Sequence, residues 1–126
     1  MQYVLSFSAR CLMSRVSFVA ALAVLLVSCS ASKSFVSYGQ RYPPNTERVR
    51  VIPPSEPIGA ACTPIGEIHV YDSGFSTSCG YDAVLEQAKK ATSENGGNAF
   101  HITRISEPNF FGSTCYRLRG EALLCK

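Results

Sequence analysis

Apolar and polar positions follow a strand-like pattern in four stretches of the chain and a helical spacing in one. The strand-like stretches are residues 47–51, 65–71, 98–105 and 115–125. Between the second and third of these, five apolar side chains recur on one side of a helix over residues 81–94. Asn95–Gly97 is expected to end this helix, because glycine adopts the left-handed cap conformation at little cost. The pattern predicts a β-β-α-β-β order, a small α+β sandwich with one helix packed on a sheet.

Two of the predicted strands alternate clearly enough to assign their faces. The apolar positions are Ile68 and Val70 in the first and Tyr116, Leu118, Gly120, Ala122 and Leu124 in the second. The polar positions are Glu67, His69 and Tyr71 in the first and Arg117, Arg119 and Glu121 in the second. Since successive side chains point to opposite faces of a strand, one face is expected in the core and the other in solvent.

A separate apolar run, Val16–Val27, lies near the N-terminus behind Arg10 and Arg15. As a helix this run would reach about 18 Å, well short of the ~30 Å hydrocarbon core of a membrane. The combination predicts that residues 1–28 are an export signal, starting at Met1 or at Met13. A permanent anchor that is not cleaved is the alternative.

The end of the run, Leu26-Val27-Ser28-Cys29, resembles the lipobox of bacterial lipoproteins. The resemblance implies that Cys29 becomes the new N-terminus and carries a diacylglycerol and an acyl chain, and we expect no other cofactor. Two or three acyl chains hold a protein on a bilayer where one would not. Ser30, in place of the aspartate that retains such proteins in the inner membrane, favours the outer membrane, with the domain in the periplasm or at the cell surface. Ordinary cleavage after Ala31 is the competing possibility.

Residues 30–46 show no lasting periodicity and contain Pro43 and Pro44. We interpret them as a tether. The predicted organisation is therefore a lipoprotein signal peptide over 1–28, a lipidated N-terminus and tether over 29–46, and a domain over 47–126. In the alternative, Phe35, Val36 and Tyr38 dock on the domain.

Charge narrows the range of partners. The net charge of the 126-residue chain is +3, from 12 basic and 9 acidic residues. Arg10 and Arg15 belong to the export signal, so 10 basic residues remain against 9 acidic ones. This near-neutral balance indicates no nucleic-acid partner.

The cysteines indicate covalent support for the domain. Four remain once Cys11 leaves with the signal and Cys29 is lipidated: Cys62, Cys79, Cys115 and Cys125. An even number in an exported domain predicts two disulfides, with three pairings open. A domain of about 80 residues buries limited apolar area, so such bonds contribute substantially to its stability.

Several short motifs together resemble a known family. They are "IGEIHV" at residues 65–70, Cys79, Ala88-Lys89, Gly97-Asn98-Ala99 and "STCYR" at residues 113–117. In their order they are similar to small lipoproteins of the RcsF type, outer-membrane sensors of envelope stress whose core fold is related to the YbjQ group. The resemblance covers about residues 49–125.

That family has two disulfides, and Cys79 and Cys115 match one of its pairs by position. The resemblance therefore implies a Cys79–Cys115 bond. The family's second pair includes a cysteine after the "GNA" strand, where this chain has none. Cys62 and Cys125 are then left as the second bond.

The sequence contains no recognisable catalytic motif, and we predict that the protein is not an enzyme and has no metal centre. His69 and His101 fall in predicted strands and are interpreted as sheet-surface residues. The alternative is an envelope metal-binding protein or small enzyme, with Cys62, Cys79 and His69 as the candidate zinc ligands.

Three phenylalanines lie in predicted loops at the ends of the sheet: Phe75, Phe110 and Phe111. Exposed aromatic side chains in such loops would be a candidate interaction surface. Between these two interpretations we expect that the phenylalanines fold back to cover a thin core. The sequence as a whole predicts a membrane-anchored envelope lipoprotein with a non-catalytic, sensor-like binding domain. By binding an unidentified envelope partner, the protein would act in stress sensing or in assembly.

Overall fold

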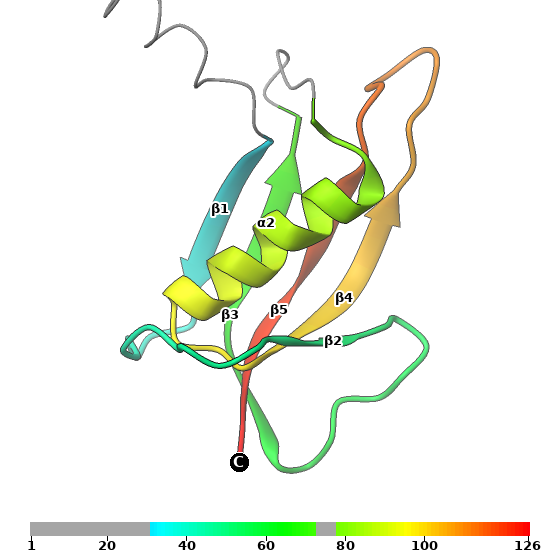
Figure 1. The fold of residues 1–126 in the computed structure, drawn as a ribbon. Coiled ribbons are helices and arrows are strands. Elements are labelled where there is room, and N and C mark those ends of the chain that lie inside the picture. The colour runs from blue at the N-terminus through cyan, green and yellow to red at the C-terminus, as the bar shows by residue number, and fades with distance from the viewer. Residues whose placement is uncertain (1–30, 73–77) are drawn as a thin grey trace, which may run out of the picture.

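The computed structural model describes residues 31–72 and 78–126 (Figure 1). Its elements are β1 (Ser32–Ser37), β2 (Arg50–Ile52), β3 (Cys62–Tyr71), α2 (Tyr81–Glu94), β4 (Ala99–Ser106) and β5 (Arg117–Cys125). The strands form one sheet in the order β1-β3-β5-β4-β2. Neighbouring strands are antiparallel except for β2 and β4, which are parallel. Helix α2 lies across one face of this sheet (Figure 1), so the predicted α+β fold is confirmed.

Helix α2 has the bounds that the apolar spacing predicts. Val84, Ala88 and Ala91 are buried against the sheet, and Asp82 lies in the first turn, near the positive end of the helix dipole. After the helix, Gly96 has a φ of 87°, and its backbone N–H donates to the carbonyl of Ser93. A glycine adopts this left-handed conformation without a steric penalty, which explains why the helix ends here.

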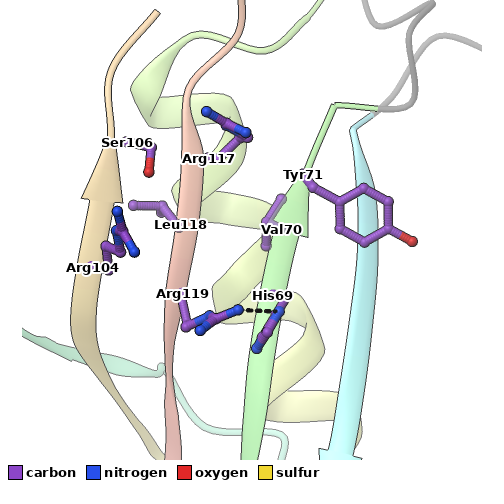
Figure 2. Close-up of a pocket in the computed structure, with 8 residues that line it drawn as sticks. All are labelled: His69, Val70, Tyr71, Arg104, Ser106, Arg117, Leu118 and Arg119. Carbon is purple, nitrogen blue, oxygen red and sulfur yellow. Dashed lines mark hydrogen bonds between the residues drawn. The ribbon is translucent and has the colours of Figure 1, made fainter. Parts of the chain in front are cut away.

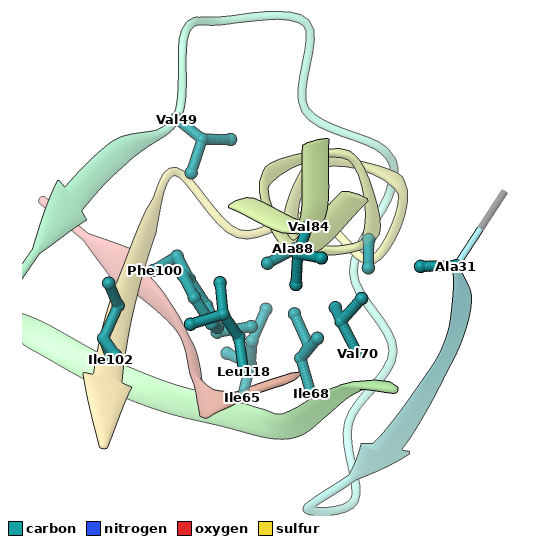
Figure 3. Close-up of a cluster of buried hydrophobic side chains, with 12 residues drawn as sticks. Ala31, Val49, Ile65, Ile68, Val70, Val84, Ala88, Phe100, Ile102 and Leu118 are labelled. Atoms are coloured by element: carbon teal, nitrogen blue, oxygen red, sulfur yellow. The ribbon is translucent and has the colours of Figure 1, made fainter. Parts of the chain in front are cut away.

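The main core lies between α2 and the sheet (Figure 3). Its buried members are Ala31, Val49, Ile65, Ile68, Val70, Val84, Ala88, Ala91, Phe100, Ile102, Leu118 and Ala122. The alternate strand positions face away from the helix, and there Ile52, Ala99 and Leu123 form a second, smaller cluster. Ile58 and the Cys62–Cys125 disulfide pack against this second cluster.

The N-terminal part of the expected tether is a strand of the sheet. Strand β1 pairs with β3 over its whole length, from Ser32 opposite Tyr71 to Ser37 opposite Gly66. Phe35 packs into the main core, and Ala31 is 5% exposed. The prediction of a tether was therefore wrong for Ser32–Ser37. Phe35 docks as the alternative proposed, whereas Val36 and Tyr38 are more than half exposed.

The chain between β1 and β2 is also attached to the domain, at the C-terminal end of α2. The backbone N–H of Asn45 donates to the carbonyl of Ser93 (2.8 Å), and the Ser93 hydroxyl donates to the carbonyl of Asn45 (2.6 Å). The Asn45 side chain donates to the carbonyl of Gly97 (3.1 Å). These bonds are polar and join residues far apart in the sequence, which is why a search for apolar periodicity does not detect them.

Both disulfides have the expected partners. Cys62–Cys125 joins directly opposite residues of β3 and β5, at the end of the sheet where the chain finishes (Figure 1). Cys79–Cys115 joins the segment before α2 to the segment before β5, at the other end. Each bond thus stabilises one end of the sheet. Within the described residues, no helix is long and apolar enough to cross a membrane.

Candidate functional site

The face of the sheet opposite α2 carries a hollow lined by basic side chains (Figure 2). The hollow has a volume of about 390 Å³. We call its polar lining the basic face, and it consists of His69, Tyr71, Arg104, Ser106, Arg117 and Arg119. These side chains come from the three central strands β3, β5 and β4. Their convergence follows from strand pairing, which brings residues far apart in sequence onto one surface.

A β-bulge places Arg104 on this face. Ile102 lies opposite Gly120 on the helix side, but the next paired residue of β4 is Arg104, opposite Arg119. Thr103 is the extra residue, and its hydroxyl donates to the carbonyl of Arg119 (3.1 Å). Without the bulge, Arg104 would point to the same side as Ile102, because side chains two apart share a face.

The arginines of the basic face differ in their partners. Arg119 Nε lies 3.5 Å from Glu67 Oε1, and a terminal nitrogen of Arg119 lies 3.4 Å from His69 Nδ1. Glu67 Oε1 in turn lies 2.9 Å from His69 Nε2. Arg104 and Arg117 make no side-chain hydrogen bond or ion pair with any residue in the described ranges 31–72 and 78–126. Positive charge at this end of the face is therefore not neutralised within the described part of the domain.

Two carboxylates, those of Glu67 and Glu121, lie further along the sheet face opposite α2, towards the C-terminal end of β1. Glu121 is opposite Glu67 in the β3–β5 pair, and Val36 of β1 is opposite Glu67 on the other side. The hydroxyl of Tyr38 donates to Glu121 Oε1 (3.1 Å). Partial loss of water around the Tyr38 phenol, followed by this hydrogen bond and the nearby negative charges of Glu121 and Glu67, raises the pKa of Tyr38 above its ordinary value. The sheet face opposite α2 is thus acidic at one end and basic at the other.

Both histidines lie in strands, as expected, on the sheet face opposite α2, and both are partly buried. His69 is half-buried between Glu67 and Arg119. His101 lies opposite Glu121 and beside Ile52 of β2, and its two ring nitrogens are buried with no hydrogen-bond partner among the described residues.

The predicted loop aromatics lie elsewhere, at one end of the sheet. Phe110 and Phe111 in the β4–β5 loop are 94% and 95% exposed, so the expectation that they fold back over the core is wrong for both. Phe75 and the lipidation candidate Cys29 lie outside the described residues.

The candidate zinc ligands do not form a site. Cys62 and Cys79 each belong to a different disulfide, so neither provides a thiolate. Among residues 31–72 and 78–126, no three His, Cys, Asp or Glu side chains are grouped so that they could hold a metal ion.

Comparison of the chain with models of protein families, with curated proteins and with solved structures found no match. The resemblance to lipoproteins of the RcsF type accordingly stays a prediction. Support for a role of the domain therefore comes from its own surface.

Proposed function

We propose that this protein is a lipid-anchored component of the bacterial envelope whose domain binds an anionic group of an envelope partner. The export signal and Cys29 support the anchor, and the two disulfides support an oxidising compartment outside the cytoplasm. The basic face supports the binding role.

One observation carries the binding role: Arg104 lies directly opposite Arg119 in the β4–β5 pair. Like charges at directly opposite positions destabilise a sheet. Arg117 adds a third positive charge two residues from Arg119, on the same face of β5. A bulge keeps Arg104 in this position, although the alternation of the strand would otherwise turn it away. Binding of an anion between the arginines offsets the repulsion.

The chemistry of these side chains indicates the class of ligand. The planar guanidinium group forms paired hydrogen bonds to carboxylate and phosphate groups. Ser106, opposite Arg117, and the half-exposed Tyr71 add hydroxyl groups at the rim. A carboxylate- or phosphate-bearing group of a partner protein or envelope polymer fits this surface. The role in stress sensing or assembly follows from the resemblance alone.

The anchor is tested by labelling cells with radioactive palmitate. We expect label on the wild-type chain, loss of label in Cys29→Ala, and accumulation of the uncleaved chain with globomycin. Label that survives Cys29→Ala would exclude the proposed anchor. Cys11→Ala is the matched control and should keep the label, since Cys11 lies within the predicted signal.

The binding face is tested by photo-cross-linking in intact cells, with a photoreactive residue in place of Tyr71. We expect discrete adducts whose yield drops several-fold when Arg104→Gln and Arg117→Gln are added. The control places the photoreactive residue at Glu86, which is exposed on α2 at the opposite face of the sheet. Equal adducts from both positions, or adducts indifferent to the arginine changes, would contradict a binding role for this face.

A further inference from the structure

The tip of the β4–β5 loop presents two adjacent phenylalanines to solvent. Phe110 and Phe111 are 94% and 95% exposed, and their ring centroids lie 5.6 Å apart in an edge-to-face arrangement. Large apolar side chains left in water forgo the gain of burial. A pair of them at one tip indicates a surface that is covered in the working protein.

The turn that carries these rings is held by hydrogen bonds. The backbone N–H of Phe111 donates to Asn109 Oδ1 (2.9 Å), and that of Gly112 donates to the carbonyl of Asn109 (3.1 Å). The N–H of Asn109 donates to the carbonyl of Ser113 (2.9 Å). The phenylalanines occupy the two central positions of a closed turn, so their exposure is a consequence of defined local structure.

The base of the loop is attached to the rest of the domain. The Ser113 hydroxyl donates to Asp72 Oδ2 at the end of β3 (2.9 Å). Two residues later, Cys115 is bonded to Cys79, and the N–H of Tyr116 donates to the carbonyl of Cys79 (3.1 Å). The loop is therefore attached to two other segments and presents its tip away from the sheet (Figure 1).

The strand registers place this loop at the end of the sheet where β1 begins. The pairs that establish this are Ser32 with Tyr71, Val70 with Leu118, and Arg117 with Ser106. Ser32 and Ser106 are three strand spacings apart, or about 14 Å at ~4.8 Å per spacing. In Figure 1 the loop rises beyond the ends of β1 and β3.

The apolar run Val16–Val27 ends only a few residues before Ser32. Ala31, which is buried in the core, follows Cys29 by two positions in the sequence. A lipid attached at Cys29 would hold this end of the sheet close to the bilayer, because only Ser30 separates Cys29 from Ala31 in the sequence.

We propose that the Phe110–Phe111 turn inserts into the lipid surface and orients the domain on the membrane. This inference rests on the proposed anchor. The anchor and the turn then form two points of attachment at one end of the sheet. With that end on the bilayer, the sheet stands across the membrane plane, and Tyr71, Ser106 and Arg117 of the basic face lie at the end nearest the lipid surface.

Tryptophan fluorescence tests the orientation, since the chain has no tryptophan of its own. The full chain with Phe110→Trp or Phe111→Trp is purified from bacterial membranes and reconstituted in phosphatidylcholine vesicles with brominated acyl chains. The control is Ser55→Trp, an exposed position in the β2–β3 connection, which leads to the other end of the sheet. We expect quenching at 110 or 111 to exceed that at 55 at least threefold, with a blue-shifted emission.

The outcomes separate this inference from the proposed anchor. Equal, weak quenching at all three positions in vesicle-bound protein would overturn the insertion while the anchor stands. Protein that carries no acyl chain and does not sediment with vesicles would overturn both. A blue shift that needs a partner protein and shows no bromine quenching would assign the turn to a protein contact and contradict the inference.

Discussion

The aromatic ring of Phe35 lies over the α-carbon of Gly66, in the space that a β-carbon on Gly66 would occupy. The carbonyl oxygen of Val36 lies 2.7 Å from that same position. Strand β1 therefore docks on β3 through a contact that only glycine permits. This contact joins the N-terminal segment to the domain.

Gly66→Ala should lower the free energy of unfolding by about 1–3 kcal/mol, because the added methyl group forces the Phe35 ring out of the core. Urea unfolding measures the loss, and hydrogen exchange should show faster exchange of the β1 amides in particular. Gly59→Ala is the control, since nothing lies within 4 Å of its β-carbon position. Equal losses in the two variants would mean that the Phe35 contact is not what holds β1.

Each disulfide should be needed for a different end of the sheet. Cys62–Cys125 and Cys79–Cys115 close separations of 63 and 36 residues. The chain-entropy account gives about 4 kcal/mol for a loop of either size. Replacing both cysteines of a pair by serine should therefore cost about 2–5 kcal/mol in either case. Only the Cys79→Ser/Cys115→Ser variant should speed amide exchange in the β4–β5 loop. Non-reduced peptide mapping that links Cys62 to Cys79 would contradict the pairing.

The sequence predicted α2, β3, β4 and β5 because each buries several apolar side chains in a regular period. Strand β2, expected over residues 47–51 and observed at Arg50–Ile52, buries Ile52 alone. Val84, Ala88 and Ala91 of the helix and Ile68 and Val70 of β3 are the clearest examples. Strand β1 is not apparent from the sequence, because Phe35 is its single core side chain. Its remaining stability comes from backbone pairing with β3, which leaves no trace in an apolar pattern.

The basic face could be predicted only in part. Alternation correctly placed Arg117 and Arg119 on the open side of β5. The position of Arg104 depends on the bulge at Thr103, and a bulge shifts the register without a sequence signal of its own. The exposure of Phe110 and Phe111 depends on side-chain and backbone hydrogen bonds within one turn, which apolar patterning does not predict.

The pKa of Tyr38 should respond to the carboxylates at the acidic end of the sheet face opposite α2. Its pKa is raised because of partial desolvation, its hydrogen bond to Glu121 and the charges of Glu121 and Glu67. Glu121→Gln keeps an acceptor but removes a charge, so it should lower the Tyr38 pKa. The titration is followed by absorbance near 295 nm, with Tyr38→Phe subtracted to isolate the residue. Glu86→Gln, on the exposed side of α2, is the control and should leave the midpoint unchanged.

The raised pKa of Tyr38 also determines the direction in which the free energy of unfolding changes with pH. The folded state holds the Tyr38 proton more tightly than the unfolded chain, whose pKa is near 10. The contribution of Tyr38 to stability is therefore fully present below pH ~10, and it is lost as the pH rises through the raised pKa of the folded state. Tyr38→Phe should flatten this alkaline loss. An unchanged alkaline profile in Tyr38→Phe would show that other groups dominate it.

Arg104→Gln should leave stability unchanged or raise it by about 0.2–1 kcal/mol, because it removes a like-charge pair with Arg119. The gain should be larger at about 0.01 M salt, where the Debye length is ~30 Å, than at 1 M, where it is ~3 Å. Arg50→Gln is the control: Arg50 pairs with Glu56 (2.6 Å) on an exposed edge, so its loss should cost about 0–1 kcal/mol. Urea unfolding at both salt concentrations measures whether each substitution raises or lowers the free energy of unfolding. If Arg104→Gln destabilises the protein at low salt, a group within the domain already stabilises the charge of Arg104. No anionic ligand is then needed between the arginines.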